Sequence, residues 1–384
     1  MARAAALAAA LLVLPGLVTA ACSTPDAATG HDGTASGAGE PPAAAGRGDD
    51  EPTTSATAPT ATTRPGERPP PGLPVEPAAP DLPAGPIPLA VADGVRPFTG
   101  LDTADPFVAV DRGVPWAFTT NTGFGNVPAT NGTAVGDALP ELPPWATPGR
   151  TWAPAVARVE GGWVLAFTAH HAASGRQCIG VATAARVDGP YVARPDPLVC
   201  DLAGGGSIDP SFVRSDLGLR LLYKVDGNCC GLPTPLRSAP LDAAGTAVAG
   251  PASTLAVADQ PWEQGLVEAP TMTYTGGRWL LLYSAARWDT AAYAVGAAWC
   301  DGPAGPCRKV GDPVLRTGGE LGGPGGLEVV PGAVATDGSR LVAFHAWPGA
   351  ATGDRGGITR QLYLGRLAID GDRVAVVPVV VGAL

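Results

Sequence analysis

The 384-residue sequence has little positive charge and no long apolar run beyond its N-terminus. Its formal net charge of −10 and isoelectric point near 4.9 exclude the basic surface that a nucleic-acid-binding protein needs. No second apolar run is long enough for a membrane-spanning helix. No stretch keeps the 3.6-residue apolar period of a long amphipathic helix. These absences exclude nucleic acid as a partner and favour strands over helices.

The cysteines lack the spacing of a zinc site, because no Cys-x-x-Cys pair and no nearby histidine accompany them. Six of the seven cysteines follow Cys22, and an even number is typical of disulfides in an exported protein. The disulfide candidates are Cys300 with Cys307 around a short turn, Cys178 with Cys200, and the adjacent Cys229 and Cys230, whose partners stay open.

Residues 1–21 resemble the signal peptide of a bacterial lipoprotein. Arg3 precedes an apolar stretch, and small residues lead directly into Cys22, which we expect to be acylated. A plain secretory signal with an incidental cysteine is the alternative. We expect the protein on the extracellular face of the bacterial cytoplasmic membrane, in contact with it only through the lipid, or secreted. Residues 22–86 are rich in Ala, Pro and Thr and predict a disordered tether.

From residue 87 to residue 384 the sequence alternates short apolar runs with Gly, Pro and Asp turns, which predicts strands. One sequence motif occurs five times: a proline opens an alternating strand, a glycine-containing turn follows, and a second apolar strand ends near an aromatic residue. These prolines are Pro106, Pro154, Pro210, Pro270 and Pro331. The repeat predicts an all-β fold, a five-bladed β-propeller with four-stranded antiparallel blades. Residues 120–150 are expected to form a long loop.

Three carboxylates occupy the start of the repeated motif: Asp105 and Asp209 directly before the proline, and Glu268 one residue further out. Innermost strands surround the channel of a propeller, so these side chains should converge at one mouth. Asp-Pro is also a common turn dipeptide, which makes a structural role the alternative at each single site. Three aspartates of the hairpin turns serve as controls and should be inert: Asp111, Asp216 and Asp337.

Four segments together resemble the successive signatures of glycoside hydrolase family 43: residues 105–106, 152–154, 208–212 and 267–270. That family comprises arabinanases, arabinofuranosidases and β-xylosidases on five-bladed propellers, and the resemblance spans roughly residues 101–376. It implies that Asp105 is the general base, Glu268 the general acid, and Asp209 the residue that raises the pKa of the acid and orients it. Inversion then requires the carboxyl groups of Asp105 and Glu268 to lie about 6.5 to 9.5 Å apart.

The resemblance also implies further residues around the pocket. Trp152 is expected to form a sugar-stacking wall, with a place in the core as the alternative. His345 resembles a histidine near the channel axis that contacts substrate or, through water, a central cation. Arg360 is expected to point towards the pocket. The expected cofactor requirement is none, with a structural calcium ion in the central channel as the alternative. His170 and His171 have no counterpart and are assigned to a solvated loop.

One departure concerns Gly325-Gly326, where many relatives have Gly-His, and it puts one polar contact to the substrate in doubt. The pattern as a whole predicts a monomeric, inverting glycosidase that acts on arabinose- or xylose-containing polysaccharide or oligosaccharide. An endo-1,5-α-L-arabinosidase or an α-L-arabinofuranosidase is the first expectation, and a β-xylosidase the second. The alternatives are a non-catalytic glycan-binding propeller and a protein-interaction propeller at the cell surface.

Overall fold

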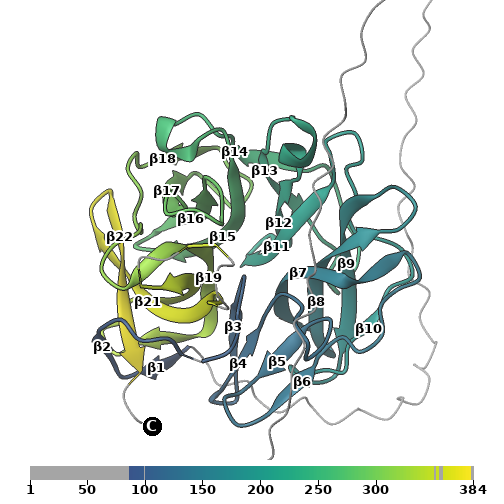
Figure 1. The fold of residues 1–384 in the computed structure, drawn as a ribbon, viewed down its shortest axis with the longest axis horizontal. Helices are drawn as coiled ribbons and strands as arrows, with labels where there is room; N and C mark the ends of the chain where they lie inside the picture. The colour runs from purple at the N-terminus through teal and green to yellow at the C-terminus, as the bar shows by residue number, and fades with distance from the viewer. Residues whose placement is uncertain (1–85, 99, 350–351, 354–357, 382–384) are drawn as a thin grey trace, which may run out of the picture. The chain divides into compact units, whose positions relative to one another are not determined.

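The computed structural model describes residues 86–98, 100–349, 352–353 and 358–381, which form five β-sheets around a central channel (Figure 1). The predicted signal peptide, Cys22 and the tether up to residue 85 lie outside the described residues. Within the described part, no helix has the length and apolar content that a membrane crossing needs. The five sheets around the channel confirm the predicted five-bladed propeller.

The blades follow one another along the chain, each with its innermost strand first. Blade 1 contains β3 (Phe107–Asp111), β4 (Val114–Phe118), β5 (Pro128–Thr130) and β6 (Val135–Asp137). Blade 2 contains β7 (Ala146–Val159), β8 (Gly162–His171), β9 (Arg176–Ala184) and β10 (Val192–Ala193). Blade 3 contains β11 (Ser207–Ser215), β12 (Gly218–Val225), β13 (Leu236–Pro240) and β14 (Ser253–Ala256). Blade 4 contains β15 (Val267–Thr275), β16 (Arg278–Ala285), β17 (Ala294–Cys300) and β18 (Cys307–Lys309).

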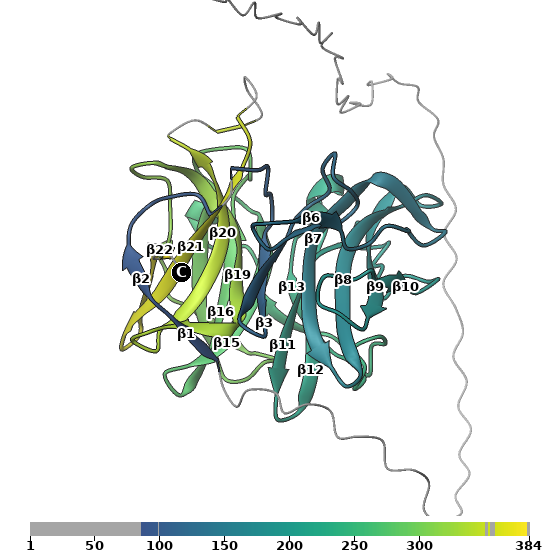
Figure 2. The same ribbon diagram turned by 90° about the horizontal axis from the view of Figure 1, so that it is seen from below.

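Blade 5 is larger than the repeat predicts, because two short strands from before blade 1 join it. Its own strands are β19 (Leu321–Ala335), β20 (Arg340–Pro348), β21 (Gln361–Asp370) and β22 (Arg373–Val381). β1 (Ile87–Leu89) pairs parallel with β19, and β2 (Val91–Asp93) pairs antiparallel with β22 (Figure 2). Both edges of this sheet are thus covered, and the two ends of the propeller are joined by hydrogen bonds.

Two expectations about loops were wrong. Residues 120–150 are not one long loop, because they contain β5, β6 and the first part of β7. His170 and His171 end β8 rather than lie in a loop, and their ring Nδ1 atoms contact Thr147 Oγ1 (3.1 Å) and Ser174 Oγ (2.8 Å). In both segments the apolar alternation is short, so the pairing partner and not the local sequence decides the strand.

Each blade has one residue with a left-handed backbone at its innermost strand, within the strand in blades 2 to 5 and two residues before β3 in blade 1: Asp105, Ala153, Asp209, Ala269 and Gly326, with φ between 43° and 55°. In blades 2 to 5 the strand pairing shifts across this residue, which marks a β-bulge. The proline pattern predicted that the fifth copy of the repeat is centred on the residue before Pro331. That prediction is wrong, because the left-handed residue of blade 5 is Gly326. Leu327 stands there where the other four blades have proline.

These bulges connect the blades to each other. The backbone N–H of each left-handed residue donates a hydrogen bond to a side chain of the preceding blade. For blade 1 the acceptor lies in blade 5. The five bonds join Asp105 N to His345 Nδ1 (3.0 Å), Ala153 N to Thr120 Oγ1 (3.1 Å), Asp209 N to Thr168 Oγ1 (3.2 Å), Ala269 N to Asp209 Oδ2 (2.9 Å) and Gly326 N to Ser284 Oγ (2.9 Å).

The hydrophobic core is divided into five clusters, one between each pair of neighbouring blades. Where strands approach closely, glycine leaves room for an aromatic ring on the next strand. A Cβ on Gly296 would lie 2.5 Å from the Tyr283 ring. That ring cannot easily move, because its hydroxyl donates to the buried carboxylate of Glu263 (2.8 Å), which also pairs with Lys309 (2.6 Å).

We predict that Gly296→Ala lowers the free energy of unfolding by about 1–3 kcal/mol, because the added methyl group overpacks the contact with Tyr283. Gly302→Ala is the control, since a Cβ on Gly302 would have no neighbour within 4 Å and the backbone there is not left-handed. Urea unfolding of the two variants checks the difference, and equal stabilities would contradict this account of the packing.

Candidate active site

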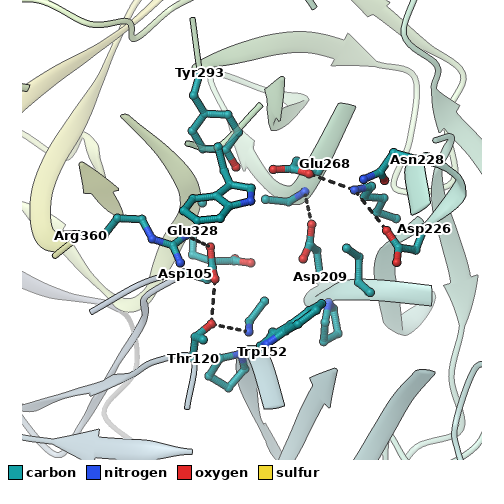
Figure 3. Close-up of a pocket in the computed structure, with 18 of the residues that line it drawn as sticks. Asp105, Thr120, Trp152, Asp209, Asp226, Asn228, Glu268, Tyr293, Glu328 and Arg360 are labelled. Carbon is teal, nitrogen blue, oxygen red and sulfur yellow. Dashed lines mark hydrogen bonds and ion pairs between the residues drawn. The ribbon is translucent and has the colours of Figure 1, made fainter. Parts of the chain in front are cut away.

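One mouth of the central channel opens into a cavity of about 470 Å³ (Figure 3). Three carboxylates from three blades line it: Asp105, Asp209 and Glu268. The structure thus brings together the three residues that the repeat singled out. The bulges explain how, because they turn the aspartates into the channel, and aspartate tolerates the left-handed backbone better than most residues.

Asp105 is surrounded by groups that favour its ionised form. Thr120 Oγ1 donates a hydrogen bond to Asp105 Oδ2 (2.8 Å), and Arg360 Nη1 lies 3.5 Å from Oδ1. Burial alone would raise the pKa of Asp105, but the positive charge of Arg360 and the hydrogen bond from the Thr120 hydroxyl hold it below its usual value. Asp105 is therefore a carboxylate at neutral pH and can accept a proton.

Asp209 and Glu268 form the opposite side of the cavity. Burial raises the pKa of Asp209 well above its usual value, the negative charge of Glu268 raises it further, and Lys224 opposes the shift. Lys224 Nζ donates to Glu268 Oε2 (2.9 Å), and Asp209 Oδ2 accepts from the backbone of Ala269. Asp209 therefore retains a proton at a pH where Asp105 has lost its own.

Aromatic side chains and Arg360 form the walls of the cavity. Trp152 lines it, as predicted, and lies across it from Arg360 in Figure 3. Arg360 also lines it and stacks on Trp288, with its guanidinium carbon 4.5 Å from the ring centroid. Trp288 is 37% exposed and so presents a free edge or face to solvent. Two indole surfaces of this kind are suited to packing against the apolar faces of sugar rings.

The structure places His345 beneath the cavity instead of in its wall. The ring is fully buried, and its Nδ1 accepts the backbone hydrogen bond from Asp105. Burial lowers the pKa of His345 to about 3, so the ring is neutral and its single proton is on Nε2. The histidine therefore supports Asp105. A neighbouring Gly326 is required, because a Cβ there would lie 2.6 Å from Nδ1.

The described side chains do not form a direct ligand set for the calcium ion that the resemblance implies. The Nε2 atom of His345 is buried without a hydrogen-bond partner among the described residues, and as an N–H group it could reach a cation only through a water molecule, as the resemblance implies. Among the described residues no group of three or more His, Cys, Asp or Glu side chains is arranged to hold a metal ion. Calcium prefers six to eight oxygen ligands, and the described acidic side chains do not supply such a set.

Comparison with known proteins agrees with this geometry. The sequence model described as glycosyl hydrolases family 43 matches residues 96–374. This chain belongs to glycosyl hydrolase family 43. It is a glycosidase on a five-bladed propeller. No curated protein matches its sequence.

Solved structures of the family have the same fold. A thermostable family-43 glycoside hydrolase is 22% identical, with a TM-score of 0.63 over 72% of this chain and 93% of that one. An endo-1,4-β-xylanase from Bacteroides thetaiotaomicron is 25% identical, with a TM-score of 0.58 over 72% and 94%. An α-L-arabinofuranosidase from Lactobacillus brevis is 18% identical, with a TM-score of 0.60 over 72% and 93%. At these identities the likeness concerns the fold and leaves the sugar open.

The three hairpin aspartates lie away from the cavity of this family-43 enzyme, as expected for structural residues. Asp111 pairs with Arg158 (3.3 Å), Asp337 accepts hydrogen bonds from Ser339, and Asp216 lies in the turn between β11 and β12. None of them lines the cavity. Position within the blade, and not acidity alone, separates the site carboxylates from these residues.

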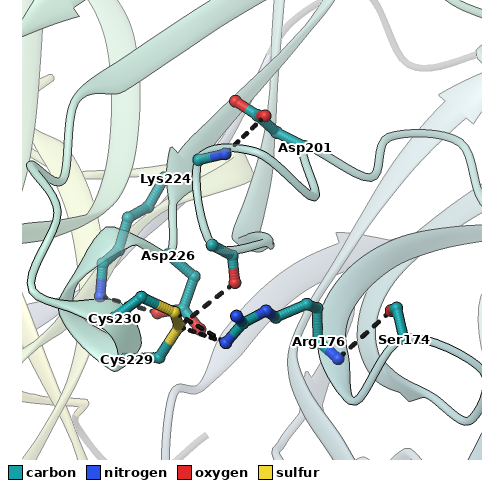
Figure 4. The surroundings of a disulfide bond; sticks show 9 residues. Ser174, Arg176, Asp201, Lys224, Asp226, Cys229 and Cys230 are labelled. Atoms are coloured by element: carbon teal, nitrogen blue, oxygen red, sulfur yellow. Dashed lines mark hydrogen bonds and ion pairs between the residues drawn. A yellow bond between two sulfur atoms is a disulfide. The ribbon is translucent and has the colours of Figure 1, made fainter. Parts of the chain in front are cut away.

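Three disulfides are present in the described part of the chain: Cys178–Cys200, Cys229–Cys230 and Cys300–Cys307. The adjacent cysteines, which the sequence left open, bond to each other within the 3-10 helix η1 (Gly227–Cys230). Cys229 lines the catalytic cavity, and Arg176 Nη1 lies 2.7 Å from the sulfur of Cys230 (Figure 4). This disulfide closes the turn that forms one rim of the site.

Sequence reasoning missed several residues of the site: Thr120, Lys224, Asp226, Trp288, Tyr293 and Glu328. The signal that could have found Lys224 is local, because it is a charged residue in the apolar strand 219–225. Glu328 was hidden by the misplaced fifth repeat. Its carboxylate accepts a hydrogen bond from Ser211 Oγ (2.8 Å). Burial, with Asp209 nearby, raises the pKa of Glu328 to about 8, against the hydrogen bonds from Thr271 and Ser211.

We predict that Glu328→Gln makes the protein less sensitive to alkaline pH. The native pKa of Glu328 is about 8 and its ordinary value 4.5, so the folded state holds a proton that the unfolded state has lost between these values. The wild type should therefore lose up to about 1.4 kcal/mol per pH unit relative to Glu328→Gln between pH 4.5 and 8, and nothing below. Urea unfolding at several pH values measures this, and parallel curves would contradict it.

Proposed function

We propose that the enzyme hydrolyses glycosidic bonds with inversion, with Asp105 as general base and Glu268 as general acid. Asp105, held as a carboxylate by Arg360 and Thr120, takes a proton from a water molecule as that water attacks the anomeric carbon. Glu268 donates a proton to the leaving oxygen as the carbon–oxygen bond breaks. The observation that supports these roles is that the pKa of Asp105 is lowered on one side of the cavity, whereas the pKa of Asp209, beside Glu268, is raised on the other.

In this proposal Asp209 keeps a proton available to the acid. Its charge and that of Glu268 repel each other, so the pair binds one proton more readily than an isolated carboxylate would. When substrate occupies the cavity, that proton is on Glu268 and points to the leaving oxygen. The backbone N–H of Ala269, which donates to Asp209 Oδ2, favours Asp209 as the ionised member of the pair.

The substrate class that we propose is a pentose-containing glycan, an α-L-arabinofuranosyl polymer or oligomer first and a β-xyloside second. The arabinofuranosidase and the xylanase named above share the fold and are the basis for this choice. Trp152 and Trp288 on the cavity wall suit sugar stacking. Cleavage of a chain from its end or from within depends on contacts beyond these residues.

We predict that the wild type releases aryl or oligosaccharide products from a panel of p-nitrophenyl pentosides, arabinan and xylan. Glu268→Gln and Asp105→Asn should each lower kcat by about 100-fold or more, because each removes one proton-transfer group. Asp216→Asn, an exposed aspartate in the same fold, is the matched control and should retain full activity. Proton NMR of the first product should show the inverted anomer.

Two results would overturn parts of this proposal. A retained anomeric configuration would reject Asp105 as a base and indicate a covalent intermediate. A wild type that binds one of these glycans but hydrolyses none would support the glycan-binding alternative, with the carboxylates as ligands for sugar hydroxyl groups.

We also propose that the enzyme is exported as a monomer and anchored by a lipid on Cys22 at the extracellular face of the cytoplasmic membrane. The lipobox-like residues before Cys22 and the disulfides of the propeller support this. We predict that the full chain, expressed in a bacterium with labelled palmitate, incorporates the label and sediments with membranes, whereas Cys22→Ser does neither. Label retained in Cys22→Ser would refute the anchor.

A further inference from the structure

One position of each blade, in the second strand of blades 2 to 5 and two residues after it in blade 1, faces the left-handed segment of the next blade. The residues are Thr120, Thr168, Lys224, Ser284 and His345, each opposite the residue that precedes the bulge. Four of them have an acceptor atom that receives the backbone N–H of the following blade. The position is therefore a structural one in four blades.

Lys224 is the exception, because an ammonium group has no acceptor atom. The N–H of Ala269, which a threonine or serine at 224 would accept, donates to Asp209 Oδ2 instead (2.9 Å). Lys224 therefore does not accept the inter-blade hydrogen bond, and Asp209 accepts it instead. Lys224 belongs to blade 3, which directly precedes the blade of Glu268. A lysine at this position therefore changes the surroundings of the proposed general acid.

Lys224 is buried among carboxylates. Its side chain is 1% exposed, and its Nζ lies 2.9 Å from Glu268 Oε2 and 3.6 Å from Asp226 Oδ1. Asp226 is fixed in turn, because its N–H donates to Gly206 O (3.0 Å) and the disulfide-closed turn η1 follows directly (Figure 4). The other lysine of the sequence, Lys309, binds Glu263 far from the cavity.

We propose that Lys224, held by Asp226, is a positioning residue for the general acid: it orients the carboxyl group of Glu268 and stabilises the carboxylate left by proton donation. This inference rests on the proposed function of Glu268. The proton passes from Glu268 to the leaving oxygen as the glycosidic bond breaks, and Lys224 keeps its own protons throughout. No residue of the family signatures quoted above occupies this place.

The charged groups around Glu268 decide the sign of the effect. Lys224 and Asp226 approach from blade 3, with Arg176 facing Asp226, while Asp209, Asp105 and the Tyr293 hydroxyl border the same space. Burial would lower the pKa of Lys224, but Glu268, Asp209 and Asp226 raise it, so Lys224 is a permanent cation. It opposes Asp209 in its effect on the proton of Glu268.

The test compares the alkaline limb of the kcat/KM–pH profile in three variants. Lys224→Gln removes the charge at similar length, and Lys224→Thr installs the residue found in two other blades. Both should move the limb upward by about one pH unit, because Glu268 then keeps its proton to higher pH. Asp226→Asn should move it downward, because Lys224 then acts on Glu268 without a competing anion. Loosened packing would not produce shifts of opposite sign.

A matched control and a second readout complete the test. Lys309→Gln should lower stability and leave the limb in place. Carbon-13 NMR titration of glutamate carboxyl groups, with Glu268→Gln to assign the signal, should show the same opposite shifts without any turnover. Unshifted or like-signed titrations would overturn the role of Lys224. If the wild type hydrolyses no glycoside but the Lys224 and Asp226 variants still shift the Glu268 titration in opposite directions, the proposed function is refuted and the coupling of Lys224 to Glu268 stands.

Discussion

The structure depends on one repeated contact, the hydrogen bond from a left-handed bulge residue of one blade to a side chain of the preceding blade. A backbone N–H in a regular strand would pair within its own sheet. The positive φ turns it sideways, at a cost of about 1 kcal/mol or more for a non-glycine residue. A hydrogen bond to the neighbouring blade offsets much of this cost. The fifth bond, between Asp105 and His345, joins the first blade to the last.

The same left-handed residues build the candidate active-site cavity, so closing the propeller and assembling the site depend on the same contacts. The residue that donates the inter-blade bond also directs its side chain into the channel, which places Asp105 and Asp209 there. His345 is buried at this contact and does not line the cavity wall. Its neutral ring accepts from the backbone of Asp105, and a glycine at 326 leaves space for it.

Two cations give the two sides of the cavity different proton affinities. Arg360 approaches Asp105 from blade 5, and within the described residues it forms no ion pair with a second carboxylate. Lys224 lies between Glu268 and Asp226, with Asp209 nearby, and so shares its charge among three carboxylates. The carboxyl group of Asp105 is therefore ionised, whereas that of Asp209 retains a proton. The vicinal disulfide at Cys229 and Cys230 fixes the turn that holds Asp226.

The sequence by itself determined the all-β class, the five blades and the three carboxylates, because strand alternation and X-Pro spacing are local patterns that repeat. It also determined an even set of cysteines, although not the pairing of Cys229 with Cys230. Only the tertiary structure decided that blade 5 repeats at Gly326, that Glu328 enters the channel and that Lys224 reaches Glu268. These depend on strand register and on contacts between blades, where residues more than 40 positions apart meet.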